Sequence, residues 1–110
     1  MAELHIHSQV VAGVPTVYLQ GDFDAYSAPR VRTLLDALTA DARPEIRLHL
    51  AGLDYVDSTG LGVLVGGLKQ AMDQAGSLCL IAPTPALRRT LRITGLDRLF
   101  PIVADDAAPA

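Results

Sequence analysis

The chain has 110 residues, of which 50% are hydrophobic and 19% are charged. This length corresponds to one globular domain, and the hydrophobic fraction is sufficient for a core. The net charge of −3 and the pI near 5.4 argue against a nucleic-acid-binding protein, which would carry a basic surface. We therefore expect one soluble domain over residues 1–110.

No targeting or membrane segment is evident. The first residues lack the basic and then apolar regions of a signal peptide. The longest stretch without polar side chains covers 60–68, well short of the roughly 20 residues of a membrane span. Cys79 is the single cysteine and lies in an apolar run, which excludes a disulfide framework and indicates a core thiol. These features predict a cytoplasmic protein that does not insert into membranes.

The first 20 residues have the apolar and polar alternation of two β-strands. Leu4, Ile6 and Val10 alternate with polar residues, and residues 14–20 continue in the same way after a turn at 12–13. The sequence therefore predicts an N-terminal β-hairpin.

A helix follows the hairpin. The stretch GDFD over 21–24 breaks the alternation, so we expect the second strand to end before it. Ser27 is a typical N-cap, and Pro29 suits the first turn of a helix. The apolar residues that follow recur at three- and four-residue steps, which indicates an amphipathic helix: Val31, Leu34, Leu35 and Leu38.

Strands and helices then alternate. Residues 46–50 have the pattern of a third strand, and from Asp54 on we expect a loop and then a helix to about Ala75, stopped by Gly76. The continuous apolar run over 78–82 is typical of a strand buried on both faces.

The last third of the chain predicts a short helix and a short strand. Leu87 and Leu91 belong to the helix, which Gly95 closes, and residues 102–103 form the strand. Residues 104–110 are expected to be a frayed acidic tail. The element order predicts an α/β fold with a four- or five-stranded, mostly parallel or mixed sheet, an N-terminal β-hairpin and three to four helices.

The helix after Asp57 has an unusual glycine content: four of the eight residues 60–67 are glycine, although each costs about 1 kcal/mol in a helix. On a helical wheel the core stripe comprises Leu61, Leu64, Val65, Leu68, Met72 and Ala75. The opposite side carries Gly62, Val63, Gly66 and Gly67. We interpret this bare side as a docking surface for another protein; close packing of Gly66 and Gly67 within the domain is the alternative.

Two histidines allow a metal-site hypothesis. His5 and His7 share one strand face, and with His49 on a nearby strand a three-histidine zinc site is conceivable. A solvated strand face is the simpler interpretation, because no acidic or thiol ligand has matching spacing. We expect no metal.

Nucleotide binding and catalysis are also disfavoured. Gly60, Gly62 and Gly66 imitate a dinucleotide fingerprint, but the next strand ends without the required carboxylate. Ser58 lacks the glycine two positions earlier that a hydrolase elbow requires, and no histidine is placed to activate it. We therefore expect a protein that is not an enzyme and needs no cofactor.

Ser58 occupies the predicted N-terminus of the glycine-rich helix, where Asp57 or Ser58 can act as the cap. In the free protein, a phosphate on Ser58 would be stabilised by the N–H groups and the helix dipole. In an interface its charge of about −1.5 to −2 would have to be desolvated beside Asp57 and Asp24. We hypothesise that phosphorylation leaves the fold intact and abolishes a contact.

Three short motifs resemble one known family. They are DSTGLG over 57–62, GDFD over 21–24 and TGL over 94–96, and the first is the specific one. Together they resemble the signature of the anti-sigma factor antagonists, which are single STAS domains. The resemblance covers about residues 4–103; many relatives continue into a final helix, whereas this sequence ends in the short acidic segment.

The resemblance implies partner switching that controls transcription through a sigma factor, as in a stress response. The implied partners are an anti-sigma factor that is also a serine kinase and, transiently, a PP2C-type serine phosphatase. Ser58 is the implied phosphorylation site. The implied neighbours of this site are Asp24, Asp57 and Thr59. The positions expected to bind the partner are Gly60, Gly62, Val63 and Gly66.

Thr59 stands where many relatives have a second serine and is an alternative acceptor. The alternative function is a STAS subunit of a membrane transport complex of the lipid-transport type.

Overall fold

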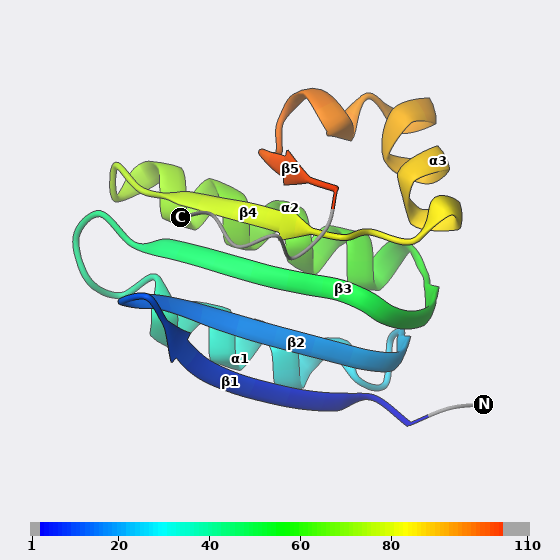
Figure 1. Cartoon of the computed structure of the whole chain (residues 1–110), viewed down its shortest axis with the longest axis horizontal. Helices are drawn as coiled ribbons and strands as arrows, with labels where there is room; N and C mark the ends of the chain where they lie inside the picture. The colour runs from blue at the N-terminus through cyan, green and yellow to red at the C-terminus, as the bar shows by residue number, and fades with distance from the viewer. Residues whose placement is uncertain (1–2, 105–110) are drawn as a thin grey trace.

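The computed structural model describes residues 3–104, and its strands form one five-stranded sheet (Figure 1). The strands are β1 (His5–Val11), β2 (Val14–Phe23), β3 (Glu45–Val56), β4 (Ser77–Ile81) and β5 (Ile102–Val103). They lie side by side in chain order; β1 and β2 are antiparallel, and the other neighbours are parallel. The predicted α/β fold with an N-terminal hairpin is confirmed.

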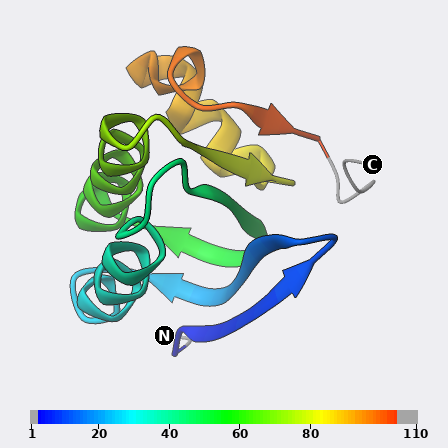
Figure 2. The ribbon, with the colours of Figure 1, turned by 90° about the vertical axis from the view of Figure 1, so that its left-hand side faces the viewer.

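Helices join the parallel strands. They are α1 (Ala28–Leu38), α2 (Ser58–Asp73) and α3 (Pro85–Thr94), followed by the short 3-10 helix η1 (Leu96–Arg98). Figures 1 and 2 show α1 and α2 side by side on one face of the sheet. The core between these helices and the sheet includes strand residues that are at most 1% exposed: Val17, Leu19, Ile46, Leu48, Leu50, Leu78 and Leu80. Helix α2 therefore packs both on the sheet and on α1.

Two strands are longer than predicted. β2 does not end before Gly21 but continues to Phe23, and Asp54 does not begin a loop because β3 continues to Val56. Phe23 and Val56 are paired across the two strands. The register between these strands shifts at two places, and such irregularities disturb the alternation from which strands are predicted. A Cβ at Gly21, where φ is +104°, would collide with the carbonyl of Glu3. Only Asp57 separates the extended β3 from α2, and residues 24–27 form the loop between β2 and α1.

The start of α1 differs in its capping from the prediction. Ser27 precedes the helix, but its backbone is helical and its hydroxyl caps no N–H of α1. The backbone carbonyl of Asp24 instead accepts from the N–H of Ala28 at 2.8 Å. Pro29 lies in the first turn, as predicted.

The end of α2 also differs. Ala75, not glycine, adopts the left-handed conformation after the helix, with φ +61°. The N–H of Gly76 donates to the carbonyl of Ala71, and that of Ala75 donates to Met72, which is a Schellman motif. Gly76 is required for another reason, since a Cβ there would collide with Pro44. Gly76 does follow the end of α2, but Ala75, and not Gly76, is the residue that ends the helix with a positive φ, so the predicted role of Gly76 is wrong.

The C-terminal elements agree with the prediction. The hydroxyl of Thr84 accepts from the N–H of Leu87 at the start of α3, and Gly95 ends the helix with φ +77°. The predicted strand at Ile102–Val103 is present as β5. The predicted acidic tail lies, from Asp105 on, outside the described residues.

Candidate functional site

Asp57 is the N-cap of α2. Its backbone is extended, and its Oδ1 accepts from the N–H of Gly60 at 2.9 Å. A carboxylate in this position satisfies an N–H group that the helix leaves unpaired and interacts favourably with the helix dipole. Because this carboxylate already occupies the helix N-terminus, the glycine-rich start of α2 is not arranged as a cradle for a nucleotide phosphate.

The same carboxylate ties α2 to a distant loop. Its Oδ2 accepts from the N–H of Ala25 at 3.1 Å, and the N–H of Asp57 donates to the carbonyl of Phe23 at 3.2 Å. The loop between β2 and α1 and the first turn of α2 therefore form one hydrogen-bonded unit.

Asp24 orders that loop from within. Its Oδ1 accepts from the N–H groups of Tyr26 and Ser27 at 3.0 and 3.1 Å. The hydroxyl of Ser27 donates to the carbonyl of Asp22 at 2.9 Å and accepts from the N–H of Asp24 at 3.0 Å. Tyr26 is thereby presented on a fixed backbone with its side chain 93% exposed. No pattern in the sequence predicts a role for this tyrosine.

Ser58 and Thr59 form the first turn of α2, and both are exposed. Since Asp57 makes the cap, neither hydroxyl is needed for the start of the helix. The structure thus places the predicted phosphorylation site on an accessible turn next to Asp57 and to the loop that contains Asp24.

The glycines of α2 have two different roles. A Cβ at Gly60 would lie 2.7 Å from the carbonyl oxygen of Phe23, and one at Gly67 would lie 2.8 Å from Cδ1 of Leu35. At Gly62 and Gly66 a Cβ would meet no atom within 4 Å. Gly60 and Gly67 therefore permit close packing inside the domain, whereas Gly62 and Gly66 leave the helix backbone open.

The outward face of α2 was only partly predicted. Val63 is 2% exposed, so its placement on the bare side is wrong, and buried Gly60 contributes no outward surface either. Met72, assigned to the core, is 60% exposed, and Ala75 is also exposed. The reason is that α2 packs on α1 as well as on the sheet, which turns its buried side toward α1. The buried residues are Gly60, Val63, Leu64, Gly67, Leu68 and Ala71.

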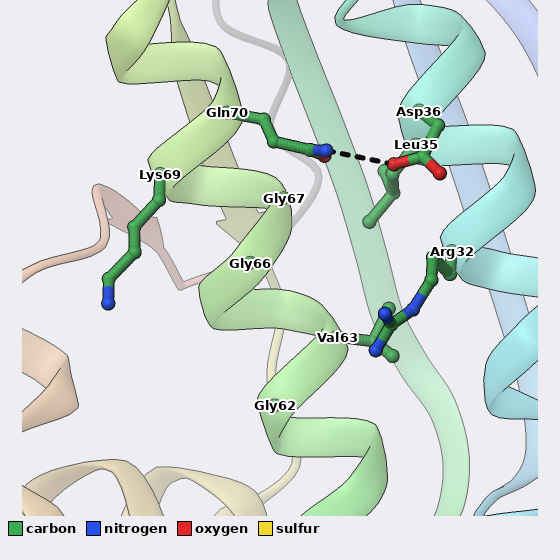
Figure 3. A pocket seen from close by; sticks show the side chains of 9 residues that line it. All are labelled: Arg32, Leu35, Asp36, Gly62, Val63, Gly66, Gly67, Lys69 and Gln70. Atoms are coloured by element: carbon green, nitrogen blue, oxygen red, sulfur yellow. Dashed lines mark hydrogen bonds between the residues drawn. The ribbon is translucent and has the colours of Figure 1, made fainter.

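A groove runs between α1 and α2 beside this open backbone (Figure 3). Gly62 and Gly66 line it from α2, and Arg32 extends toward it from α1. Nε2 of Gln70 donates to Oδ1 of Asp36 at 3.0 Å and bridges the two helices across the groove. The contribution of α1 to this surface was not predicted, because helix neighbours cannot be inferred from an amphipathic pattern alone.

The structure does not support the zinc hypothesis. Tyr18 lies between His7 and His49 in the sheet, with ring centroids 5.8 and 5.0 Å away. Within residues 3–104, no group of three histidine, cysteine or acidic side chains is arranged to hold a metal ion.

Cys79 is partly buried, and burial raises the pKa of its thiol. Across residues 3–104, no helix is both long and apolar enough to span a membrane.

Comparisons with known proteins agree with the motifs. The family model "STAS domain" matches residues 5–107. The anti-sigma-B factor antagonist of Bacillus subtilis is 42% identical over 88 residues, which cover 80% of each chain. That of Listeria monocytogenes is 35% identical over 86 residues, which cover 78% of this chain and 75% of the relative.

A solved structure supports the same assignment. An anti-sigma factor antagonist from Mycobacterium paratuberculosis superposes with a TM-score of 0.81 at 28% identity, over 92% of this chain and 86% of the other. The chain belongs to the STAS domain family, among the anti-sigma factor antagonists, and the predicted family is confirmed.

Proposed function

We propose that this protein is an anti-sigma factor antagonist, which binds an anti-sigma factor and so frees a sigma factor for transcription. The names of relatives up to 42% identical support this function. The observation that carries the proposal is the exposed Ser58 hydroxyl at the N-terminus of α2, next to a fixed loop and an open stretch of helix backbone.

The proposed partner surface has three parts. Ser58 and Thr59 provide the first turn of α2, Gly62 and Gly66 provide backbone that another protein can approach closely, and Tyr26 provides an exposed aromatic side chain. Aromatic residues held on a fixed backbone commonly dominate binding energy at interfaces. Val63 and Gly60 support this surface from beneath rather than contacting the partner.

Phosphorylation of Ser58 is the proposed off-switch. The added charge of about −1.5 to −2 lies at the positive end of the α2 dipole, so the free protein tolerates it. In the complex the same charge must lose its water next to the Asp57 carboxylate, and this cost opposes binding. Asp24 adds negative charge in the neighbouring loop. The fold therefore persists while the contact is lost.

The proposed partner is an anti-sigma factor that is also the serine kinase, and a PP2C-type phosphatase restores the hydroxyl. Both act in the cytoplasm in this proposal. Thr59 is exposed on the same turn, but the motif assigns the phosphate to Ser58.

A pull-down from the native cell, followed by mass spectrometry, tests the proposal. Ser58→Ala should retain a small kinase-like anti-sigma factor, Ser58→Asp should fold but lose it, and Thr59→Ala should behave as the unmodified protein. Equal retention by Ser58→Asp would disprove the switch. Recovery of a membrane transporter in place of the anti-sigma factor would support the transport-complex alternative instead.

A further inference from the structure

β1 is an edge strand of the sheet that residues 3–104 form, and the turn after it fixes which of its backbone groups point outward (Figure 1). Ala12 and Gly13, with φ values of +51° and +80°, form a two-residue turn of the primed type between Val11 and Val14. Val11 and Val14 are therefore a hydrogen-bonded pair, because they are the first and last residues of the turn. Pairs of this kind alternate along an antiparallel ladder.

This alternation assigns the N–H and C=O groups of His7 and Gln9 to the β2 side. The backbone N–H and C=O groups of Ile6, Ser8 and Val10 consequently point away from β2, outward from the edge of the sheet. A Cβ at Gly21 in β2 would collide with the carbonyl oxygen of Glu3, which places that carbonyl on the β2 side and agrees with the same odd-numbered parity. The outward row begins after Leu4, whose carbonyl accepts from Nη1 of Arg30 at 3.0 Å.

The edge lacks the features that usually prevent strand pairing. β1 has seven residues, HIHSQVV, with no proline, lysine or acidic residue, and its register with β2 is continuous. The other edge, β5, has two residues. Val10 is 70% exposed at the outward edge, so a large apolar side chain is left uncovered there.

The outward row is also self-complementary. Its midpoint is Ser8, so a two-fold axis at Ser8 brings Ile6 of one copy opposite Val10 of the other, and Ser8 opposite Ser8. His7 then lies opposite Gln9 on the other face of the strand. Over residues 6–10, apolar residues therefore meet apolar ones and polar residues meet polar ones. At the ends of the strand His5 lies opposite Val11, and no like charges are opposed.

We propose that two copies of this protein pair antiparallel through β1, with the two-fold axis at Ser8, and form one continuous sheet across the dimer. Each outward pair exchanges both of its backbone hydrogen bonds. The contact uses the same strand on both copies, so assembly stops at the dimer. One strand from each copy makes a small interface, and the dimer is therefore reversible and concentration-dependent.

Sedimentation equilibrium of the purified chain, from low micromolar to several hundred micromolar, measures this dimer. Ser8→Lys places two like charges directly opposite each other and should raise the dimer dissociation constant at least about tenfold. Ala37→Lys adds the same charge on the exposed side of α1 and should leave the dissociation constant unchanged.

Proline variants test the parity independently. Ser8→Pro removes an N–H that points outward, so it should abolish the dimer while the hairpin is kept. Gln9→Pro removes an N–H that bonds to β2 and should destabilise the monomer. If Ser8→Pro fails to fold, the parity is wrong.

Amide hydrogen exchange by NMR gives a readout for single residues. Protection of the N–H groups of Ile6, Ser8 and Val10 should increase with protein concentration, whereas that of His7 and Gln9 should not. A protein that stays monomeric throughout the concentration range, or a dimer that Ser8→Lys leaves unchanged, overturns the proposal.

Discussion

Oδ2 of Asp57 accepts a hydrogen bond from the N–H of Ala25, 32 positions earlier in the chain, while Oδ1 of the same carboxylate caps α2 at Gly60. One side chain therefore holds the loop before α1 and the first turn of α2 in a fixed relation. The proposed partner surface includes residues from both segments, so its shape depends on Asp57.

Asp57→Ala should lower the free energy of unfolding by about 1–3 kcal/mol, because it removes the helix cap and leaves the N–H of Ala25 without its acceptor. Urea denaturation measures the change. Asp57→Asn separates the two bonds: its amide oxygen can still cap the helix at Gly60, but its NH2 group cannot accept from the N–H of Ala25, so its loss should be smaller than that of alanine but not zero. Equal losses would mean that the retained cap at Gly60 contributes nothing, and would overturn the role of Asp57 as the helix cap.

The two kinds of glycine in α2 should respond in opposite directions to alanine. Gly62→Ala and Gly66→Ala fill open space on an exposed helix and should each stabilise the fold by up to about 1 kcal/mol. Gly60→Ala places a methyl group against the backbone of Phe23 and should destabilise it by about 1–3 kcal/mol.

In the partner pull-down, Gly62→Ala and Gly66→Ala should reduce binding despite their greater stability. This combination separates a functional glycine from a structural one. Unchanged binding by both variants would remove the open backbone from the proposed surface.

Tyr26→Ala should reduce partner binding at least about tenfold and change the free energy of unfolding by less than about 0.5 kcal/mol. The side chain is 93% exposed, so its removal costs the free protein little. Ile93 is another exposed apolar residue, on α3, and Ile93→Ala should leave binding unchanged. An equal effect of the two variants would show that Tyr26 has no special part in recognition.

Ala75→Gly should stabilise the protein by about 0.5–1 kcal/mol. Ala75 adopts a left-handed conformation that costs a non-glycine residue about 1–2 kcal/mol, and glycine recovers most of this after its own entropic cost. A thermal melt measures the gain. Ala37→Gly, on the exposed side of the last turn of α1, should instead destabilise by up to about 1 kcal/mol, which controls for a general effect of glycine.

The sequence was most informative where a structural signal is local. The hairpin followed from alternation around Ala12 and Gly13. The α2 cap was predicted as Asp57 or Ser58, and the structure has Asp57. The ends of β2 and β3 were missed because a shifted register removes the alternation at Gly21, although Phe23 beyond it is fully buried.

The orientation of α2 could not be predicted for a different reason. A helix that packs on both a sheet and another helix has a wide buried side, and the sequence does not show where that side ends. The apolar pattern therefore put Val63 outside and Met72 inside, whereas the buried side of α2 is turned toward α1 and includes Val63 but not Met72. Gly66 and Gly67 are chemically identical, and the positions of Leu35 on α1 and Leu78 on β4 distinguish their roles.

The hydrogen bond between Gln70 and Asp36 limits what the groove between α1 and α2 can accommodate. The open backbone extends from Gly62 to Gly66, about 6 Å of helix, before this bond crosses the groove. That length matches a single helical turn or the tip of a loop, and a long helix lying in the groove would first have to break the bond. In the proposed complex, the part of the partner that enters the groove is therefore short, and the rest of the contact falls on Tyr26 and on the first turn of α2.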